Sequence, residues 1–330
     1  MSDEAMRRTE AESSRYRSLN DYFREQFGGK VYKLALDAGM TCPNRDGRLG
    51  VRGCSFCADG SSTFAAKQVR DVEAQLDSAK ALLARKTKAD KPLYMAYFQS
   101  YTNTYAPVEI LDALFRPVLE QPDIVGLAIG TRPDCLPEDV IALLRRLNQV
   151  KPVWVELGLQ TIHERTTLTI NRCYTLDTFE QALAKLHDAG IETVVHLIFG
   201  LPGESREDML ATVDYVASLP IQGVKLHLLH VLEGTALAED YRAGKFSCLR
   251  EGEWLDLLCE ILPRLPSGMV IHRLTGDGPK ELLLAPLWTA DKRRVLNRIQ
   301  ATFRERNIRQ GSAWTENSWQ NRELENGCCC

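Results

Sequence analysis

Six apolar segments of strand length alternate with amphipathic segments of helical length between residues 31 and 231. Strands that are apolar on both faces belong to parallel sheets covered by helices. A regular strand–helix alternation therefore predicts a partial (βα)6 TIM-like barrel of the α/β class, with a doubly wound parallel sheet as the alternative. The expected strands cover residues 31–38, 92–99, 124–130, 153–160, 192–200 and 223–231.

Helix signals agree with this order of elements. An amphipathic helix ahead of the first strand ends at Gly28-Gly29. Asp177 followed by Glu180, and Ser205 followed by Asp208, predict helix N-termini, because a side-chain acceptor there can satisfy free backbone N–H groups. Gly190 stands where a helix would end. Apolar residues at helical spacing begin at residue 69, and further helices are expected over 107–121, 137–149, 177–189 and 205–218.

The regular alternation stops after residue 232. Two helical patterns, a short apolar strand at 269–277 and a basic helix at 289–306 follow. We predict a polar, disordered leader over 1–17, a barrel over 18–232, a C-terminal α+β extension over 233–315 and a flexible tail over 316–330.

Composition limits the classes of partner. The chain has 41 Lys and Arg against 44 Asp and Glu, for a net charge of −3, so an RNA contact would need a local basic patch. Its apolar runs are far shorter than the ~20 residues that span a bilayer, which predicts no membrane partner. The N-terminus lacks the apolar region of a secretory signal, so we expect a cytoplasmic protein whose cysteines are thiols or metal ligands.

Three cysteines, Cys42, Cys54 and Cys57, stand in the loop after the first expected strand. Structural zinc normally takes four protein ligands, and a redox Cys-x-x-Cys needs only two. Three thiolates suit a [4Fe–4S] cluster that keeps one iron open for a substrate or cofactor atom. A zinc site completed by a distant Cys or His is equally compatible with the spacing.

The aromatic Phe56 before the last cysteine, in a loop after the first strand of a six-strand barrel, resembles the radical S-adenosylmethionine (SAM) superfamily. Eleven residues separate Cys42 from Cys54, where the common superfamily spacing has three. The longer spacing is similar to that of the bacterial YhcC/YtqA family, which is related to the radical SAM domain of the Elongator catalytic subunit. The resemblance covers about residues 18–315 and includes "KLALDAGMTCPNRDG", "YFQSYTNTYAP", "VGLAIGTRPDC", "ELGLQT", "HLIFGLPGE" and "LLLAPLW".

This resemblance implies an enzyme that cleaves SAM reductively to form a 5′-deoxyadenosyl radical, with a [4Fe–4S] cluster held by the three cysteines. It also implies an external one-electron reductant of the flavodoxin or ferredoxin type. SAM contacts are implied for Gln99 near the methionine amine, for Glu156 and Gln160 at the ribose, for Arg172 at the carboxylate, and for His196 and Gly200 behind the adenine. Family members usually have Gly-His where this chain has Cys173-Tyr174.

Lys225 and His227 are two residues apart on the last expected strand, so they share one face. A charge inside a barrel needs a partner or a role, and we expect this pair to be catalytic on the substrate side. His230, Arg132 and His272-Arg273 are further candidates for the substrate entrance.

For the substrate, the family resemblance implies the wobble uridine of tRNA. The basic segment 291–310 offers a phosphate-binding face, or a helix whose outer side is merely solvated. Two other functions stay open: a radical SAM enzyme acting on a small metabolite or peptide, and a non-catalytic binding barrel stabilised by zinc.

Overall fold

The computed structural model describes residues 14–58, 71–84, 91–276 and 278–315. Most of the expected leader, the expected tail and the three cysteines at 328–330 lie outside these residues, as does the beginning of the helix expected from residue 69.

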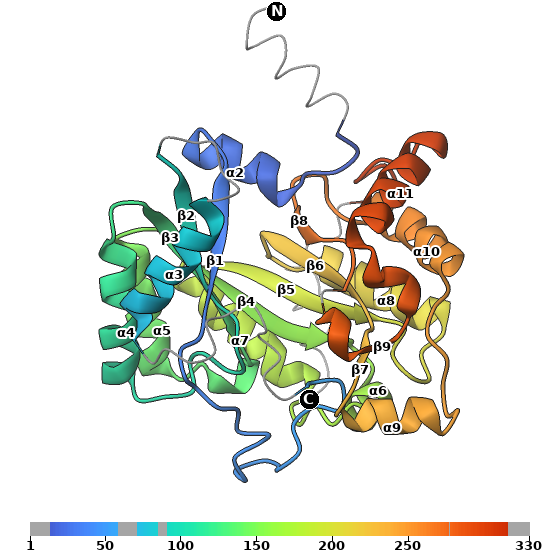
Figure 1. The fold of residues 1–330 in the computed structure, drawn as a ribbon, viewed down its shortest axis with the longest axis horizontal. Coiled ribbons are helices and arrows are strands. Elements are labelled where there is room, and N and C mark those ends of the chain that lie inside the picture. Colours follow the sequence, from blue (N-terminus) through green and yellow to red (C-terminus); the bar gives the residue numbers. More distant parts are fainter. Residues whose placement is uncertain (1–13, 59–70, 85–90, 277, 316–330) are drawn as a thin grey trace, which may run out of the picture.

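One curled sheet forms the centre of the molecule, and helices cover its outer side (Figure 1). All neighbouring strands in it are parallel, in the order β1-β2-β3-β4-β5-β6-β8, which confirms the partial TIM-like barrel. The strands are β1 (Val31–Leu36), β2 (Leu93–Phe98), β3 (Ile124–Thr131), β4 (Val153–Gln160), β5 (Glu192–Phe199), β6 (Gly223–Leu228) and β8 (Val270–Arg273).

The seventh strand comes from the C-terminal extension. We expected a strand in this part of the extension but did not assign it to the barrel sheet; β8 pairs with β6 and places Arg273 beside Lys225. The expected sixth strand is also shorter than predicted, because β6 ends at Leu228. Residues Val231–Leu232 form β7, which pairs antiparallel with β9 (Leu283–Ala285). The division into barrel and extension stays a prediction.

The helices lie where the apolar periodicity placed them. The Ser205–Asp208 capping box is confirmed, but α7 is capped by Thr175, not Asp177, because the Thr175 hydroxyl accepts the Thr178 N–H. The short α6 (Glu164–Thr169) was missed. The others are α2 (Leu19–Phe27), α3 (Val72–Ala84), α4 (Val108–Glu120), α5 (Glu138–Asn148), α7 (Leu176–Asp188), α8 (Arg206–Ala217), α9 (Ala236–Arg242), α10 (Glu251–Arg264) and α11 (Lys292–Glu305), with 3-10 turns at Pro133–Cys135, Lys280–Leu282 and Leu287–Ala290.

Helix α2 closes the amino-terminal end of the barrel, at the top of Figure 1. Phe23 is buried and stacks on Trp154 of β4, with ring centroids 5.6 Å apart. Ser18, the N-cap of α2, forms a β-bridge with Ile271 of β8. The carboxyl ends of the strands, where the cysteine loop lies, therefore form the open end, as in other barrels of this kind.

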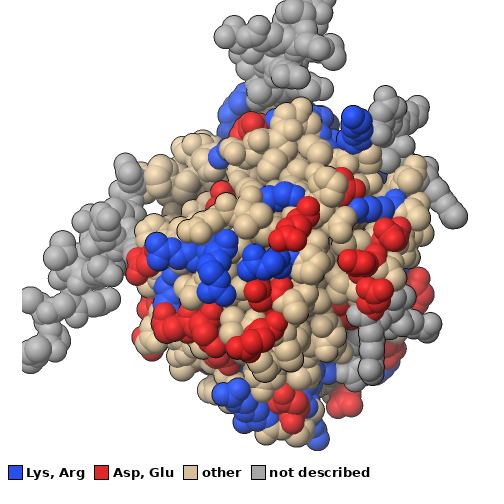
Figure 2. Space-filling model, turned by 90° about the vertical axis from the view of Figure 1, so that its left-hand side faces the viewer, with Lys and Arg blue, Asp and Glu red and all other residues tan. Residues whose placement is uncertain are grey.

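Ion pairs join the helices on the outside of the molecule. Those between α8, α10 and α11, which we call the outer ion pairs, are Arg206–Glu260, Arg264–Asp214, Arg294–Glu251 and Arg306–Asp256. On the face shown in Figure 2, basic and acidic side chains are likewise interspersed. No helix in the described part of the chain is long and apolar enough to cross a membrane.

Candidate active site

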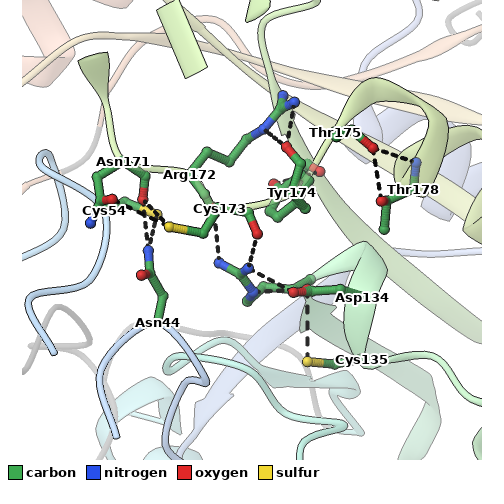
Figure 3. Close-up of polar contacts among 12 residues, drawn as sticks. Asn44, Cys54, Asp134, Cys135, Asn171, Arg172, Cys173, Tyr174, Thr175 and Thr178 are labelled. Carbon is green, nitrogen blue, oxygen red and sulfur yellow. Dashed lines mark hydrogen bonds and ion pairs between the residues drawn. The ribbon is translucent and has the colours of Figure 1, made fainter. Parts of the chain in front are cut away.

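The three cysteines of the loop after β1 line one cavity of about 170 Å³ at the carboxyl end of the sheet, which we call the cysteine cavity. Asn44 holds this loop in place: its Nδ2 donates to the Asn171 carbonyl at 2.7 Å and contacts the Cys54 sulfur at 3.7 Å (Figure 3). Burial, followed by the neighbouring Cys57, raises the pKa of the Cys54 thiol to about 12. A cation at this point would favour the thiolate.

The thiols surround a cavity and do not converge on one point. Within the described residues, no three His, Cys, Asp or Glu side chains are grouped closely enough to hold a single metal ion. A multi-iron cluster suits three thiols spread around a cavity, because each thiolate binds a different iron.

Behind the cysteine cavity, four side chains from four strands form a buried charged group, which we call the lumen cluster: Lys33, Glu156, His196 and Lys225. Glu156 accepts a hydrogen bond from Lys33 Nζ at 2.9 Å, is paired with Lys225, and lies 3.0 Å from His196 Nε2. Its side chain is 0% exposed. Burial alone would raise the pKa of the Glu156 carboxyl, but Lys225 and Lys33 hold it well below its ordinary range.

Lys225 is therefore placed differently from our expectation. Its ammonium group contacts Glu156 and the Tyr97 hydroxyl, the latter at 2.9 Å, and it does not line the cavities described here. Burial lowers its pKa to about 7, against the attraction of Glu156. The geometry thus pairs Lys225 with the Glu156 carboxylate, and its catalytic role stays a prediction.

Two histidines, His196 of the lumen cluster and the neighbouring His227, are neutral near pH 7. Burial, and then the charge of Lys225, lowers the pKa of His196 to about 4. Burial and Arg273 hold the pKa of His227 well below its usual value. Their rings are 5.3 Å apart, and both line a second cavity of about 310 Å³, the middle cavity. His227 Nε2 is buried and has no hydrogen-bond partner within the described part of the chain, so it can serve a ligand.

The middle cavity shares Phe56, Cys57, Gln99, Gln160 and His196 with the cysteine cavity. Among the residues expected to bind SAM, Glu156 lines the cysteine cavity as well. The structure thus brings together most of the predicted site. The middle cavity in turn shares His230 and the segments around Gly276 and Gly278 with an outer cavity of about 600 Å³.

Two predicted residues lie elsewhere. Arg172 is fully buried, and its guanidinium donates to the carbonyls of Leu159, Thr161 and Tyr174; its contact with the SAM carboxylate stays a prediction. Gly200 has a φ of +82°, and a Cβ there would lie 3.2 Å from Leu249 of the extension. Its missing side chain leaves room for Leu249; its expected place behind the adenine stays a prediction.

Sequence reasoning missed several residues of the wall. Tyr101, Thr131 and Tyr174 line the cysteine cavity, and so does Arg132, which we had placed at the substrate entrance. Arg132 pairs with Asp134 at 2.8 Å and donates to the Arg172 carbonyl. The sequence signal that could have identified Tyr174 is that it stands where family members usually have a histidine.

Comparison with known proteins decides between the hypotheses for this site. Residues 46–216 match the Radical SAM superfamily, and residues 221–305 match the Radical_SAM C-terminal domain. The chain belongs to the radical SAM superfamily. It is 46% identical to the uncharacterized protein YtqA of Bacillus subtilis over 298 residues, which are 90% of this chain and 92% of YtqA.

At lower identity, the chain is also similar to Elongator proteins. The chain is 28% identical over 167 residues to the tRNA uridine(34) acetyltransferase of Methanocaldococcus infernus, covering 48% of this chain and 30% of that protein. The solved structure of the archaeal Methanocaldococcus infernus Elp3 superimposes with a TM-score of 0.65 at 18% identity, covering 85% of this chain and 64% of Elp3. This likeness supports the shared barrel fold.

The protein is thus a radical SAM enzyme, and its superfamily uses a [4Fe–4S] cluster, SAM and an external reductant. The donor set fits these groups, since three thiols and a partnerless imidazole nitrogen face adjoining cavities. The zinc-stabilised, non-catalytic barrel is set aside.

Proposed function

We propose that this radical SAM enzyme modifies the side chain of the wobble uridine in tRNA. The observation that carries the proposal is the similarity to a tRNA uridine(34) acetyltransferase, which extends over about half of this chain. The adjoining cavities support it, because shared lining residues connect the outer cavity, through the middle cavity, to the cysteine cavity, and an enzyme that modifies a base must bring that nucleotide into its site.

Cys42, Cys54 and Cys57 would hold the cluster, and polar groups on the shared wall, Gln99 and Gln160, would bind SAM. When bound and reduced, the cluster and SAM supply a 5′-deoxyadenosyl radical that takes a hydrogen atom from the substrate. Apolar side chains of the middle cavity, including Phe56, Ile198 and Leu228, exclude water from this region. The neutral imidazoles of His196 and His227 can donate or accept a hydrogen bond without adding charge.

The outer cavity supplies the groups that an RNA backbone requires. Lys280 and Lys292 line it, and His230 stands between it and the middle cavity. Within the predicted basic segment, Arg294 of α11 and Arg306, which follows α11, are paired with Glu251 and Asp256. We place the phosphate contacts at Lys280 and Lys292.

We also infer a cytoplasmic location and a flavodoxin- or ferredoxin-type reductant, since a one-electron donor of low potential must reach the cluster. The test of function compares tRNA nucleosides by mass spectrometry in a deletion strain carrying the wild-type gene, the Cys54→Ala variant or no gene. We expect a wobble-uridine modification that depends on the wild-type gene.

An unchanged nucleoside profile would contradict the tRNA assignment. If the purified enzyme, reduced under anaerobic conditions, still released 5′-deoxyadenosine from SAM, the substrate would then be a small metabolite or peptide.

A further inference from the structure

We propose that Tyr174 is a positioning residue that holds the Gln160 carboxamide at the junction of the cysteine and middle cavities, where its amide nitrogen donates to an oxygen of the nucleoside half of bound SAM. The inference rests on the proposed SAM site and assigns to this chain a pair, Tyr174 and Gln160, that acts as one unit.

The backbone at Gln160 is held in an unusual conformation. Gln160 ends β4 with a φ of +63°, and the register between β4 and β5 shifts between Gly158 and Gln160. A left-handed conformation is costly for a residue with a side chain and persists where the surroundings impose it. Such a shift redirects a side chain at the end of a strand. Here Gln160 lines both cavities.

The phenol of Tyr174 fixes the amide of Gln160. Its hydroxyl lies 2.9 Å from Gln160 Oε1 and 3.0 Å from the Gly158 carbonyl, and it donates to this pair of oxygens. With Oε1 turned to the phenol, the amide nitrogen has no hydrogen-bond partner among the described residues. That nitrogen is therefore available as a donor to a ligand.

Gly158 fits the same arrangement. A Cβ at this position would lie 2.7 Å from Gln160 Nε2 and 3.1 Å from the Tyr174 hydroxyl oxygen. Contacts of 2.7 Å are too short for carbon and nitrogen, so an alanine here would displace the amide. The absence of a side chain at Gly158 therefore leaves the space that the Gln160 amide and the Tyr174 hydroxyl occupy.

Two arginines pack against the ring of Tyr174. The guanidinium carbons of Arg132 and Arg172 lie 4.7 Å and 4.5 Å from the centre of its ring. Arg172 also donates to the carbonyls on both sides of Gln160, those of Leu159 and Thr161, and to the carbonyl of Tyr174. The buried Arg172 therefore connects the two residues through their backbones. Burial raises the pKa of the Tyr174 phenol, so it remains a donor at neutral pH.

The test measures the affinity of the anaerobically reconstituted holoenzyme for S-adenosylhomocysteine by isothermal titration calorimetry. Tyr174→Phe removes only the hydroxyl, and we expect the Kd to rise about 3- to 10-fold, as for the loss of one neutral hydrogen bond. Gln160→Ala should weaken binding by at least as much. Adding Tyr174→Phe to Gln160→Ala should change the Kd less than 2-fold, because the hydroxyl then has no amide to position.

Tyr215→Phe is the matched control. It removes a hydroxyl that donates to Glu180 at 2.6 Å between α7 and α8, away from the cavities, and should leave the Kd unchanged. A normal Kd for Tyr174→Phe, or effects of the two site variants that multiply in the double variant, would overturn the proposal.

Iron content and visible absorbance are compared in parallel. If Tyr174→Phe loses its cluster, Gly158→Ala replaces it, since it keeps the phenol and its Cβ would lie closest to the amide, 2.7 Å from Gln160 Nε2; an unchanged Kd for that variant would equally overturn the proposal. The test measures only the affinity for a SAM analogue, in the absence of RNA. Its result therefore does not depend on whether tRNA is the substrate.

Discussion

The lumen cluster and the outer ion pairs use the same kinds of side chain in opposite surroundings. Glu156 is completely enclosed and touches three basic groups, whereas the partners of the outer pair Arg264–Asp214 are 37% and 53% exposed. Exposed pairs are solvated whether or not they form, so they contribute little to stability. A buried carboxylate costs several kcal/mol of desolvation and depends on its partners. The comparison shows two uses of charge. The buried carboxylate of Glu156, whose desolvation is costly, lines the cysteine cavity, whereas the exposed ion pairs join helices on the outside of the barrel.

The largest effect should follow removal of the shared carboxylate. Glu156→Ala leaves Lys33 and Lys225 buried without their anion, so we expect the free energy of unfolding to fall by about 3–5 kcal/mol. Anaerobic urea unfolding measures this, and Glu260→Ala in the outer pair with Arg206 is the matched control. Equal losses for the two variants would mean that burial does not distinguish the two regions.

Acid should weaken the inner region through His196. Its pKa is about 4 in the folded chain and 6.5 in the unfolded chain, so between these values only the unfolded chain binds the proton. Stability must then decrease as the pH falls from 6.5 to 4, by up to ~3 kcal/mol for this group. In the His196→Gln variant, the free energy of unfolding should depend less on pH than in the wild type. His187→Gln, which changes an exposed residue of α7, is the control and should keep the wild-type pH dependence. If the stability of His196→Gln fell with decreasing pH as steeply as that of the wild type, His196 would not be the group responsible.

A smaller effect is expected from Lys225→Met, which keeps the length of the side chain and removes its charge. Glu156 still contacts Lys33 and His196, so we expect a loss of about 1–2 kcal/mol. Because Lys225 lowers the pKa of His196, the variant should raise that pKa, as seen by NMR titration of the imidazole. An unmoved titration would show that Lys225 does not act on His196.

The smallest effect should come from the outer ion pairs. Arg264→Ala and Arg306→Ala should each change the free energy of unfolding by less than about 1 kcal/mol, and the difference should shrink in high salt. A loss comparable to that of Glu156→Ala would show that these pairs are structural.

The fold could be predicted because each barrel strand and the helix after it carry their own local pattern. The β8 strand could not be placed, since two helices and a long loop separate it from β6, its partner. The apolar pattern of a segment predicts that it forms a strand, but it does not show which distant strand it pairs with.

For the site, the cysteine spacing and the polar residues at strand ends indicated which residues line the cavities. Nine of the eleven residues predicted to hold the cluster, bind SAM or act in catalysis line a cavity or belong to the lumen cluster. The two that do not, Arg172 and Gly200, were carried over from the family resemblance by residue type. A residue type does not reveal whether a guanidinium faces a ligand or backbone carbonyls. Only the positions of Leu159, Thr161 and Tyr174 determine that.

The bridge between Ser18 and Ile271 has a consequence for biosynthesis. Helix α2 leaves the ribosome first, yet the strand that fastens its start is made about 250 residues later. Until then the bridge that fixes the start of α2 cannot form, although Phe23 and Trp154 have both been made. The last contact of the barrel floor therefore depends on nearly the whole chain being synthesised.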